Sequence, residues 1–384
     1  MDSSLDSSNF LAGGRLTVDL DALTHNWLYL AGLARGAECA AAVKGDAYGT
    51  GLVPSARALW MAGCRTFFVA LPSEALELRK VLPEAVVYVL NGLFQGAGRV
   101  FADNDFRPVL GSVEEIDEWR SFCLSEGRRL PAALHVDTGM NRLGLSMDEA
   151  RHLANEGEGT GGPIDWALLM SHLACADTPD HPLNDRQFAR FEEARALFPG
   201  LPASLANSAG ILTRDEWHYD MVRPGVALYG GEAVAGRPNP MRPVAALEGR
   251  IVQVREVSAE ETVGYGAKQA AIRPSRIALV SVGYADGYHR LLGSSDGHIG
   301  ASAWIGEHEC PLFGRVSMDL LAIDVTGIDP TLARRGGWVE LIGPHNPVDK
   351  VAIHGETIGY ELLTHLGPRY RRTYIGGAER KVSD

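Results

Sequence analysis

Short apolar runs alternate with longer segments of helical periodicity along the first half of the chain. The amphipathic segments, such as residues 73–81, 113–125 and 184–198, start at or near good helix-starting residues and predict helices. Eight apolar runs predict strands, at residues 40–43, 66–70, 86–90, 107–110, 133–137, 167–172, 203–207 and 220–223. Eight strand–helix repeats predict an α/β fold, a closed (β/α)8 TIM barrel, with an open doubly wound sheet as the alternative.

The pattern changes at residues 236–243, where several prolines disfavour both helix and central strand. Short strands separated by turn residues are predicted beyond this point, at residues 249–256, 276–282, 300–305, 320–325 and 337–342. We therefore predict a flexible N-terminus at residues 1–14, a barrel domain at 15–236 that begins with a strand, and a β-rich C-terminal domain at 237–384.

Length and charge narrow the class of protein. A chain of 384 residues exceeds the size at which one hydrophobic core stops growing, which favours two domains. Its net charge of −12 argues against nucleic-acid and membrane partners, so a small molecule is the expected ligand. The chain has neither an apolar run of the roughly 18 residues that span a bilayer nor a secretory signal pattern, so we expect a cytoplasmic protein.

The cysteines favour neither a disulfide framework nor a zinc site. Their number is odd and no Cys-x-x-Cys pair occurs. We expect buried reduced thiols and no metal ligands among Cys39, Cys64, Cys123, Cys175 and Cys310.

The segment 41–51, AAVKGDAYGTG, places a lysine where a buried strand ends and glycines force a turn. A lysine that is removed from water loses its proton more readily, and its free amine can condense with an aldehyde to form a Schiff base. Lys44 is therefore a candidate for imine chemistry, with Tyr48 near the same turn. Taken alone, a solvated lysine at a strand end is the commoner situation.

Other reactive groups also follow predicted barrel strands. Lys44, residues 137–142, His172 and Arg223 lie at the ends of strands one, five, six and eight, so a barrel would bring them to one mouth. The small residues at 207–210 and 223–226 follow strands seven and eight, where such barrels often bind phosphate. An imine-forming lysine beside a phosphate site indicates pyridoxal 5'-phosphate as cofactor.

Five motifs, AVKGDAYG at 42–49, DTGMNRLG at 137–144, RPGVALYG at 223–230, GYADG at 283–287 and GRVSMD at 314–319, together resemble those of the alanine racemases, which are fold-type III pyridoxal-phosphate enzymes. The resemblance extends from about residue 16 to residue 374. It implies interconversion of L-alanine and D-alanine, the latter a component of peptidoglycan. A serine-preferring or broader amino-acid racemase is the nearest alternative, since a pocket separates alanine from serine by little more than one hydroxyl.

By this resemblance, Lys44 holds the cofactor and then acts as acid and base on one face of the substrate α-carbon, while Tyr284 serves the other face. Two groups are needed, because a proton returned only to the face it left regenerates the starting enantiomer. His172 and Arg223 would favour the phenolate of that tyrosine. Arg223 would donate to the pyridine nitrogen, because a guanidinium rarely gives up its proton; pairing with a barrel carboxylate is its alternative role.

The resemblance also implies further contacts. Arg142 would contact the cofactor's phenolic oxygen and the substrate carboxylate, and Met318 would enclose the substrate. A homodimer is implied, in which the β domain of one subunit supplies the tyrosine and the methionine to the barrel of the other. The remaining expected cofactor-binding residues, chiefly at the phosphate, are Tyr48, Asn207, Ser208, Gly225, Val226 and Tyr360.

Two positions depart from the family pattern. His135 stands where many members have a lysine that becomes carbamylated, so the anion expected beside Arg142 is missing. A chloride ion or a nearby carboxylate is the expected replacement. Ser317 stands where cysteine is common.

Two alternatives from other classes are disfavoured. A non-catalytic cofactor-carrying barrel predicts neither a second domain nor Tyr284. A two-domain amino-acid decarboxylase predicts an acid rather than Arg223 at the pyridine nitrogen.

Overall fold

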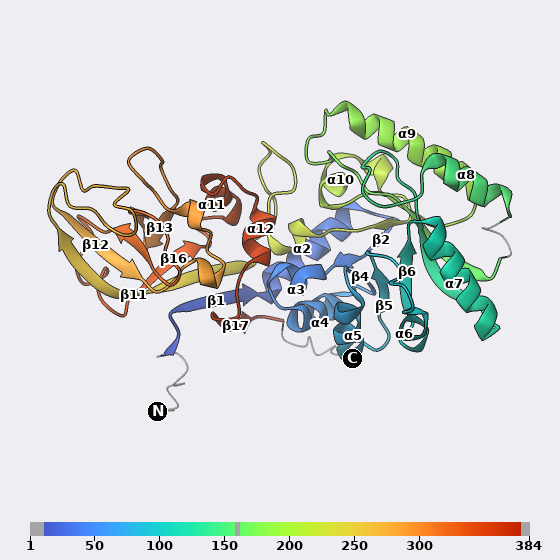
Figure 1. The fold of residues 1–384 in the computed structure, drawn as a ribbon, viewed down its shortest axis with the longest axis horizontal. Helices are drawn as coiled ribbons and strands as arrows, with labels where there is room; N and C mark the ends of the chain where they lie inside the picture. Colours follow the sequence, from blue (N-terminus) through green and yellow to red (C-terminus); the bar gives the residue numbers. More distant parts are fainter. Residues whose placement is uncertain (1–10, 158–161, 378–384) are drawn as a thin grey trace.

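The computed structural model describes residues 11–157 and 162–377 and divides into a barrel and a β-rich part that lie side by side along the long axis (Figure 1). The predicted flexible N-terminus falls mostly on residues 1–10, which lie outside the described residues. Within the described ranges, no helix has the length and apolar character required to cross a membrane.

The barrel consists of parallel strands joined in sequence order from β3 to β9. Strand β10 closes the ring, since it pairs with β2, and the amides of Asp220 and Arg223 donate to the carbonyls of Ala203 and Ala206 at 3.1 and 2.9 Å. The strands are β2 (Glu38–Cys39), β3 (Ala41–Ala42), β4 (Thr66–Val69), β5 (Val86–Val89), β6 (Phe106–Leu110), β7 (Leu130–His135), β8 (Ile164–Met170), β9 (Ala203–Ser204) and β10 (Met221–Val222). The predicted closed barrel is confirmed, with its first strand divided into β2 and β3 at Ala40.

Helices follow the strands and surround them (Figure 1). The side chains of Ser112, Ser146 and Asn207 cap α7, α8 and α10, since each accepts a hydrogen bond from an amide of the first turn. The helices are α2 (Leu20–Leu33), α3 (Lys44–Tyr48), α4 (Leu52–Ala62), α5 (Pro72–Val81), α6 (Gly98–Asp103), α7 (Val113–Glu126), α8 (Met147–Asn155), α9 (Pro182–Leu197) and α10 (Ser208–Thr213), with 3-10 turns η1 (Asp215–Trp217) and η2 (Val226–Tyr229).

Side chains fill the interior of the barrel. Phe68 and Tyr88 stack with ring centroids 4.9 Å apart and contact the small side chains of Ala40, Ala42 and Ala133 in a buried cluster. The interior is therefore a packed core rather than a channel, and a ligand can bind only at one end of the strands.

The second part is built on an eight-stranded sheet ordered β14-β13-β16-β11-β1-β17, with β12 joining β11 to β15. Its strands pair antiparallel except for β1 with β17. The strands are β1 (Gly14–Asp19), β11 (Ala245–Val257), β12 (Ser275–Val280), β13 (Ser302–Ile305), β14 (His308–Pro311), β15 (Leu321–Asp324), β16 (Trp338–Ile342) and β17 (Arg371–Ile375). Within residues 237–377, short helical segments complete it, namely η3 (Tyr284–Asp286), η4 (Arg290–Leu292), α11 (Val348–His354) and α12 (Gly359–Thr364).

The first strand belongs with this sheet and not with the barrel, which corrects the placement of residues 15–19 in the barrel domain. Strand β1 pairs antiparallel with β11 and parallel with β17. The side chain of Arg15 donates to Glu248 at 2.5 and 2.7 Å, an ion pair across the first of these pairings. The pattern of residues 15–20 predicts a strand but carries no information about its distant partner.

Helix α12 brings the β-rich part to the barrel. It packs on α3, the short helix that contains Lys44. The guanidinium of Arg372 donates to the carbonyl of Gly49 at 2.7 Å and lies 3.5 Å from the carboxylate of Asp46. The turn that follows β3 is therefore in contact with the barrel and with the β-rich part.

Candidate active site

A cavity of about 960 Å³ lies at the carboxyl ends of the barrel strands and extends to α12. Ten of the twelve predicted site residues line it, together with His135. These ten are Lys44, Tyr48, Arg142, His172, Asn207, Ser208, Arg223, Gly225, Val226 and Tyr360.

The backbone after β3 turns sharply at Lys44. Gly45, Asp46 and Ala47 have φ values of 64°, 56° and 52°, a left-handed conformation that is unfavourable for residues with a Cβ. Side chains hold this turn, since the amide of Gly45 donates to Glu74 at 2.6 Å and Asp46 accepts from the amide of Leu52 at 2.7 Å. The strained turn therefore fixes the lysine at the cavity.

The surroundings of Lys44 favour its neutral amine. Burial and then the positive charge of Arg142 lower the pKa of Lys44 from its ordinary value of 10.5, while Glu74 opposes the shift. Because the neutral form is the nucleophile, these surroundings prepare the amine for attack on a carbonyl carbon.

Arg223 is 5% exposed and reaches into the cavity from the end of β10. It donates to the hydroxyl of Ser204, to the carbonyl of Ser171 at 2.6 Å and to Nδ1 of His172 at 3.4 Å. In the described part of the chain no carboxylate lies within 4.0 Å of it. The alternative role of Arg223, pairing with a barrel carboxylate, is therefore wrong.

Burial lowers the pKa of Arg223 to about 10, so its guanidinium stays charged near neutral pH. Burial and the charge of Arg223 hold the pKa of His172 well below 6.5. A neutral His172 accepts at Nδ1 from Arg223 and carries its proton on Nε2. Arg223 and His172 are therefore both hydrogen-bond donors at a buried position.

His135 and Arg142 also face the cavity. Burial, and then the charge of Arg223, lowers the pKa of His135 to about 4, so this ring is neutral and supplies no charge. No carboxylate among the described residues lies within 4.0 Å of Arg142. None of these carboxylates is therefore placed to replace the carbamate that the family pattern leads us to expect.

The loops after β9 and β10 meet at the cavity through Ser208 and Gly225. The hydroxyl of Ser208 accepts from the amides of Gly225 and Ala227 at 2.8 and 3.3 Å. A Cβ added at Gly225 would lie 2.4 Å from the phenol oxygen of Tyr48. A side chain at this position would have to displace that phenol, so the glycine leaves the backbone open to a ligand.

The two tyrosines beside this loop are hydrogen-bond donors. Burial raises the pKa of Tyr48 well above 10 and that of Tyr360 to about 12, so both phenols keep their protons. Tyr48 also stacks on Tyr229, with ring centroids 4.7 Å apart. The loop and the phenols can therefore bind an anion such as phosphate.

The other two predicted residues lie outside this cavity. Tyr284 and Met318 are 43% and 53% exposed on the β-rich part. The amides of Tyr284 and Ala285 donate to the carbonyls of Ser317 and Met318, both at 3.0 Å, so the two segments lie together. Asp286 holds the first segment, because it accepts from the amide of Gly283 and pairs with Arg369 at 2.8 Å.

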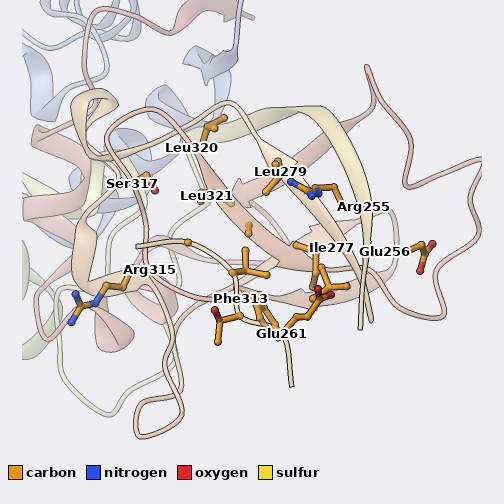
Figure 2. A pocket seen from close by; sticks show the side chains of 15 residues that line it. Arg255, Glu256, Glu261, Ile277, Leu279, Phe313, Arg315, Ser317, Leu320 and Leu321 are labelled. Carbon is orange, nitrogen blue, oxygen red and sulfur yellow. The ribbon is translucent and has the colours of Figure 1, made fainter. Parts of the chain in front are cut away.

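A second hollow, of about 350 Å³, lies in the β-rich part (Figure 2). Phe313, Arg315 and Ser317 border it, together with Ile277 and Leu320. None of the twelve predicted site residues lines this hollow.

Several cavity residues were not among the predicted ones. Glu74, besides its bond to Gly45, accepts from the amides of Ala70 and Leu71, and so orders the rim of the cavity. Thr357, Glu361 and Thr364 reach the cavity from α12 and the segment before it, for which no element was predicted. The one sequence signal for Glu74 is its position in the first turn of a predicted helix, where a glutamate can accept hydrogen bonds from backbone amides.

Family profiles match both parts of the chain. The profile "Alanine racemase, N-terminal domain" matches residues 18–233, and "Alanine racemase, C-terminal domain" matches residues 244–374. The alanine racemase of Methylobacterium sp. (strain 4-46) is 53% identical over 363 residues, which cover 94% of this chain and 98% of the relative. That of Rhizobium meliloti is 47% identical, covering 97% of this chain and all of the relative.

Solved structures agree in fold. The alanine racemase of Bartonella henselae, crystallised with covalently bound pyridoxal phosphate, superposes with a TM-score of 0.89 at 38% identity, covering 95% of this chain and all of that one. The biosynthetic alanine racemase of Pseudomonas aeruginosa gives a TM-score of 0.85 at 34% identity, with the same coverage.

Proposed function

Because the chain belongs to the alanine racemase family, we propose that it is a pyridoxal-phosphate-dependent enzyme that interconverts L-alanine and D-alanine with two acid–base groups, Lys44 and Tyr284. The observation that carries the proposal is that a lysine of lowered pKa and a buried arginine with no carboxylate within 4.0 Å among the described residues face one cavity.

The cavity suits the cofactor at three points. The hydroxyl of Ser208, which accepts two amide hydrogen bonds and still has its own proton to donate, would hold the phosphate with the backbone at Gly225 and Val226 and the phenols of Tyr48 and Tyr360. The amine of Lys44 would bind the aldehyde carbon. When bound, pyridoxal phosphate supplies that carbon and a ring that spreads the negative charge left on a deprotonated α-carbon.

Arg223 would hold the ring nitrogen. A guanidinium can only donate there, so the nitrogen stays without a proton and the ring withdraws less charge. Brief stabilisation suits a racemase, because the α-carbon must regain its proton quickly. The contacts of Arg223 to Ser204 and Ser171 fix the direction in which its remaining N–H groups point.

Tyr284 would remove or return the proton on the face opposite Lys44. Its exposure and its absence from the cavity of its own chain support a head-to-tail homodimer, in which this side chain and Met318 complete the site of the partner. A Cβ at Gly283 would lie 2.2 Å from the carbonyl oxygen of Met318, so glycine lets the two segments approach and present both side chains together.

A bound anion, which we propose is chloride, would steady Arg142. The neutral ring of His135 leaves its charge unbalanced, and no carboxylate of the described residues is close enough to replace the carbamate. With its orientation fixed in this way, Arg142 would bind the substrate carboxylate.

Substitution tests the two acid–base roles. Lys44→Ala is expected to lose the visible absorption of the lysine-bound cofactor and its activity. Tyr284→Phe should keep the absorption but lower kcat by about 10²–10⁴-fold, the usual contribution of an acid–base group. Tyr29→Phe is a matched control, a tyrosine 40% exposed on α2, and should leave both unchanged. A borohydride-reducible cofactor linkage retained in Lys44→Ala would contradict the assignment.

We further propose that the enzyme acts in the cytoplasm and supplies D-alanine for peptidoglycan. Expression in a bacterium that requires D-alanine tests this role and should restore growth on medium without it. A coupled assay with D-amino-acid oxidase over L-alanine and L-serine tests the substrate, and faster turnover of L-serine would favour the alternative racemase.

A further inference from the structure

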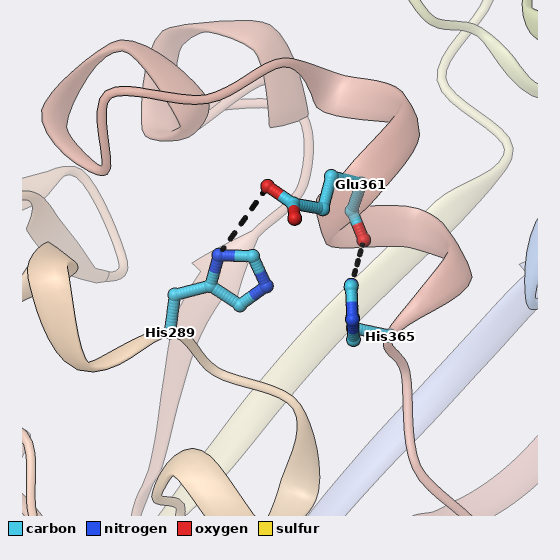
Figure 3. Close-up of side chains that lie close together, drawn as sticks. All are labelled: His289, Glu361 and His365. Atoms are coloured by element: carbon cyan, nitrogen blue, oxygen red, sulfur yellow. Dashed lines mark hydrogen bonds and ion pairs between the residues drawn. The ribbon is translucent and has the colours of Figure 1, made fainter.

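Three side chains outside the proposed catalytic set converge between the loop after η3 and helix α12 (Figure 3). One ligand atom from each of His289, Glu361 and His365 lies within 4.8 Å of the others. Nδ1 of His289 lies 3.9 Å from Oε2 of Glu361, and the two imidazole rings meet edge to face with centroids 4.9 Å apart.

We propose that His289, Glu361 and His365 form a binding site for a divalent first-row transition-metal ion, with Zn²⁺ as the best fit. Two imidazoles and one carboxylate are the nitrogen and oxygen ligands that this ion takes, and three protein ligands leave a fourth position for water. The two histidines come from different segments, so a bound ion would link the loop to α12.

Hydrogen bonds orient two of the three proposed ligands, His365 and Glu361. Nδ1 of His365 lies 2.7 Å from the carbonyl oxygen of Glu361. A carbonyl only accepts, so this nitrogen carries the proton and Nε2 is left with a lone pair for a metal. The carboxylate of Glu361 accepts from the hydroxyl of Thr357, which helps to orient it.

His289 faces the same point from the other segment. Its Nδ1 lies 3.9 Å from the carboxylate of Glu361, and its ring packs on that of His365, so one ion could be bound by all three side chains.

The backbone already holds the two segments in contact. A Cβ at Gly287 would lie 1.7 Å from the carbonyl oxygen of His365, and the amide of Gly367 donates to the carbonyl of Asp286 at 3.0 Å. Ligands of a tetrahedral zinc ion lie about 3.4 Å apart, given metal–ligand bonds of about 2.1 Å. Rotations of the side chains can close the remaining distance, because Glu361 and His365 are exposed.

The position of the site gives a bound ion a structural consequence. Glu361 lines the main cavity with Thr357 and Tyr360, whereas His289 follows Tyr284 closely in the chain. If the proposed function holds, α12 lies beside the active site of its own chain, and the segment with Tyr284 completes the active site of the partner. The ion would then link these two elements. Binding of the ion itself does not depend on that function.

This site departs from the expectation of no metal ligands. That expectation rested on the cysteines, which take no part here. The ligands lie in two separate segments, and only the packing of α12 on the loop brings them together.

Calorimetric titration of the cofactor-loaded, chelator-treated protein with Zn²⁺ tests the proposal. One ion per chain is expected. Because loss of a mere outer-shell partner costs up to about 100-fold in affinity, removal of a ligand in His289→Gln or His365→Gln should cost at least that much. His354→Gln is the matched control, a half-buried histidine at the end of α11 and outside the cluster, and should leave the affinity unchanged.

Co²⁺ provides a second readout. In the wild-type protein it should give the intense visible bands of a four-coordinate ion, and both histidine variants should lose them. Equal Zn²⁺ affinity in the wild type and the two variants, or no binding by the wild type, would overturn the proposal. Normal Zn²⁺ binding by Lys44→Ala, which is expected to be inactive, separates this inference from the proposed catalytic role.

Discussion

The surroundings of Arg223 are the clearest sign of a ligand at the scale of single residues. Its buried charge meets a hydroxyl, a carbonyl and an imidazole, and no carboxylate of the described residues is within 4.0 Å. A buried charge without an ionic partner is costly, so such a group is retained where something else binds it. The ring nitrogen of pyridoxal phosphate would be that partner.

The lowered pKa of Lys44 predicts the pH dependence of cofactor binding. Because its pKa lies below 10.5, the neutral amine is populated at lower pH than in free lysine. Imine formation by the cofactor-free enzyme should therefore quicken as pH rises and reach half of its plateau rate below pH 10.5. Stopped-flow absorbance after mixing with pyridoxal phosphate measures this profile.

Two variants of Arg142 test the cause of this lowered pKa of Lys44. Its charge lowers the pKa of Lys44, so Arg142→Gln should move the plateau to higher pH, whereas Arg142→Lys keeps the charge and should move it less. An identical profile in all three proteins would contradict the electrostatic role of Arg142.

The proposed anion beside Arg142 can be located directly. Crystals grown with bromide in place of chloride should show an anomalous peak next to its guanidinium. His135→Lys, which offers an amine for carbamylation, should abolish the peak. Absence of a peak in the wild-type crystal would mean that Arg142 is not steadied by a halide.

At the scale of elements, the turn after β3 depends on Gly49. Its φ is 76°, and an added Cβ would lie 2.0 Å from the carbonyl oxygen of Leu363 in α12. Gly127, after α7, has φ 63° and open space around its Cβ position. Gly127→Ala should therefore cost about 1 kcal/mol of unfolding free energy for conformation alone, and Gly49→Ala about 3 kcal/mol or more because α12 must also move. Denaturant unfolding measures both, and equal losses would show that this contact is unimportant.

The barrel could be predicted because its signal is local. Each strand is a short apolar run and each is followed by a helical segment, so the periodicity changes repeatedly. Strands β14 and β17 were missed, since three of the four residues of β14 and three of the five residues of β17 are exposed. The place of β1 was wrong because its partners β11 and β17 lie far away in the chain.

The candidate site could likewise be predicted where it depends on local sequence and not where it depends on contacts between distant segments. The residues at the ends of barrel strands lie at one cavity, as the barrel geometry requires. The contribution of α12 could not be predicted, because it depends on the packing of the second part against the first. The place of Tyr284 and Met318 opposite Lys44 stays a prediction, since a single chain leaves them outside its own cavity.

At the scale of the whole molecule, the proposed sharing of each site between two subunits predicts complementation between impaired subunits. A mixed dimer of Lys44→Ala and Tyr284→Phe contains one site with both native residues and one site with neither. Random exchange of subunits makes about half of the dimers mixed, so the mixture should recover about a quarter of wild-type activity. Each variant alone should stay at or below about a hundredth of wild-type activity. A mixture that is no more active than the single variants would contradict a site shared between subunits.

The fate of hydrogen at the α-carbon tests the two-sided mechanism most directly. L-Alanine incubated with the enzyme in deuterium oxide should give D-alanine that carries deuterium at the α-carbon from the first turnovers, because one residue removes the proton and another, exchanged with solvent, supplies its replacement. D-Alanine that retains the original protium in those turnovers would contradict the proposed mechanism.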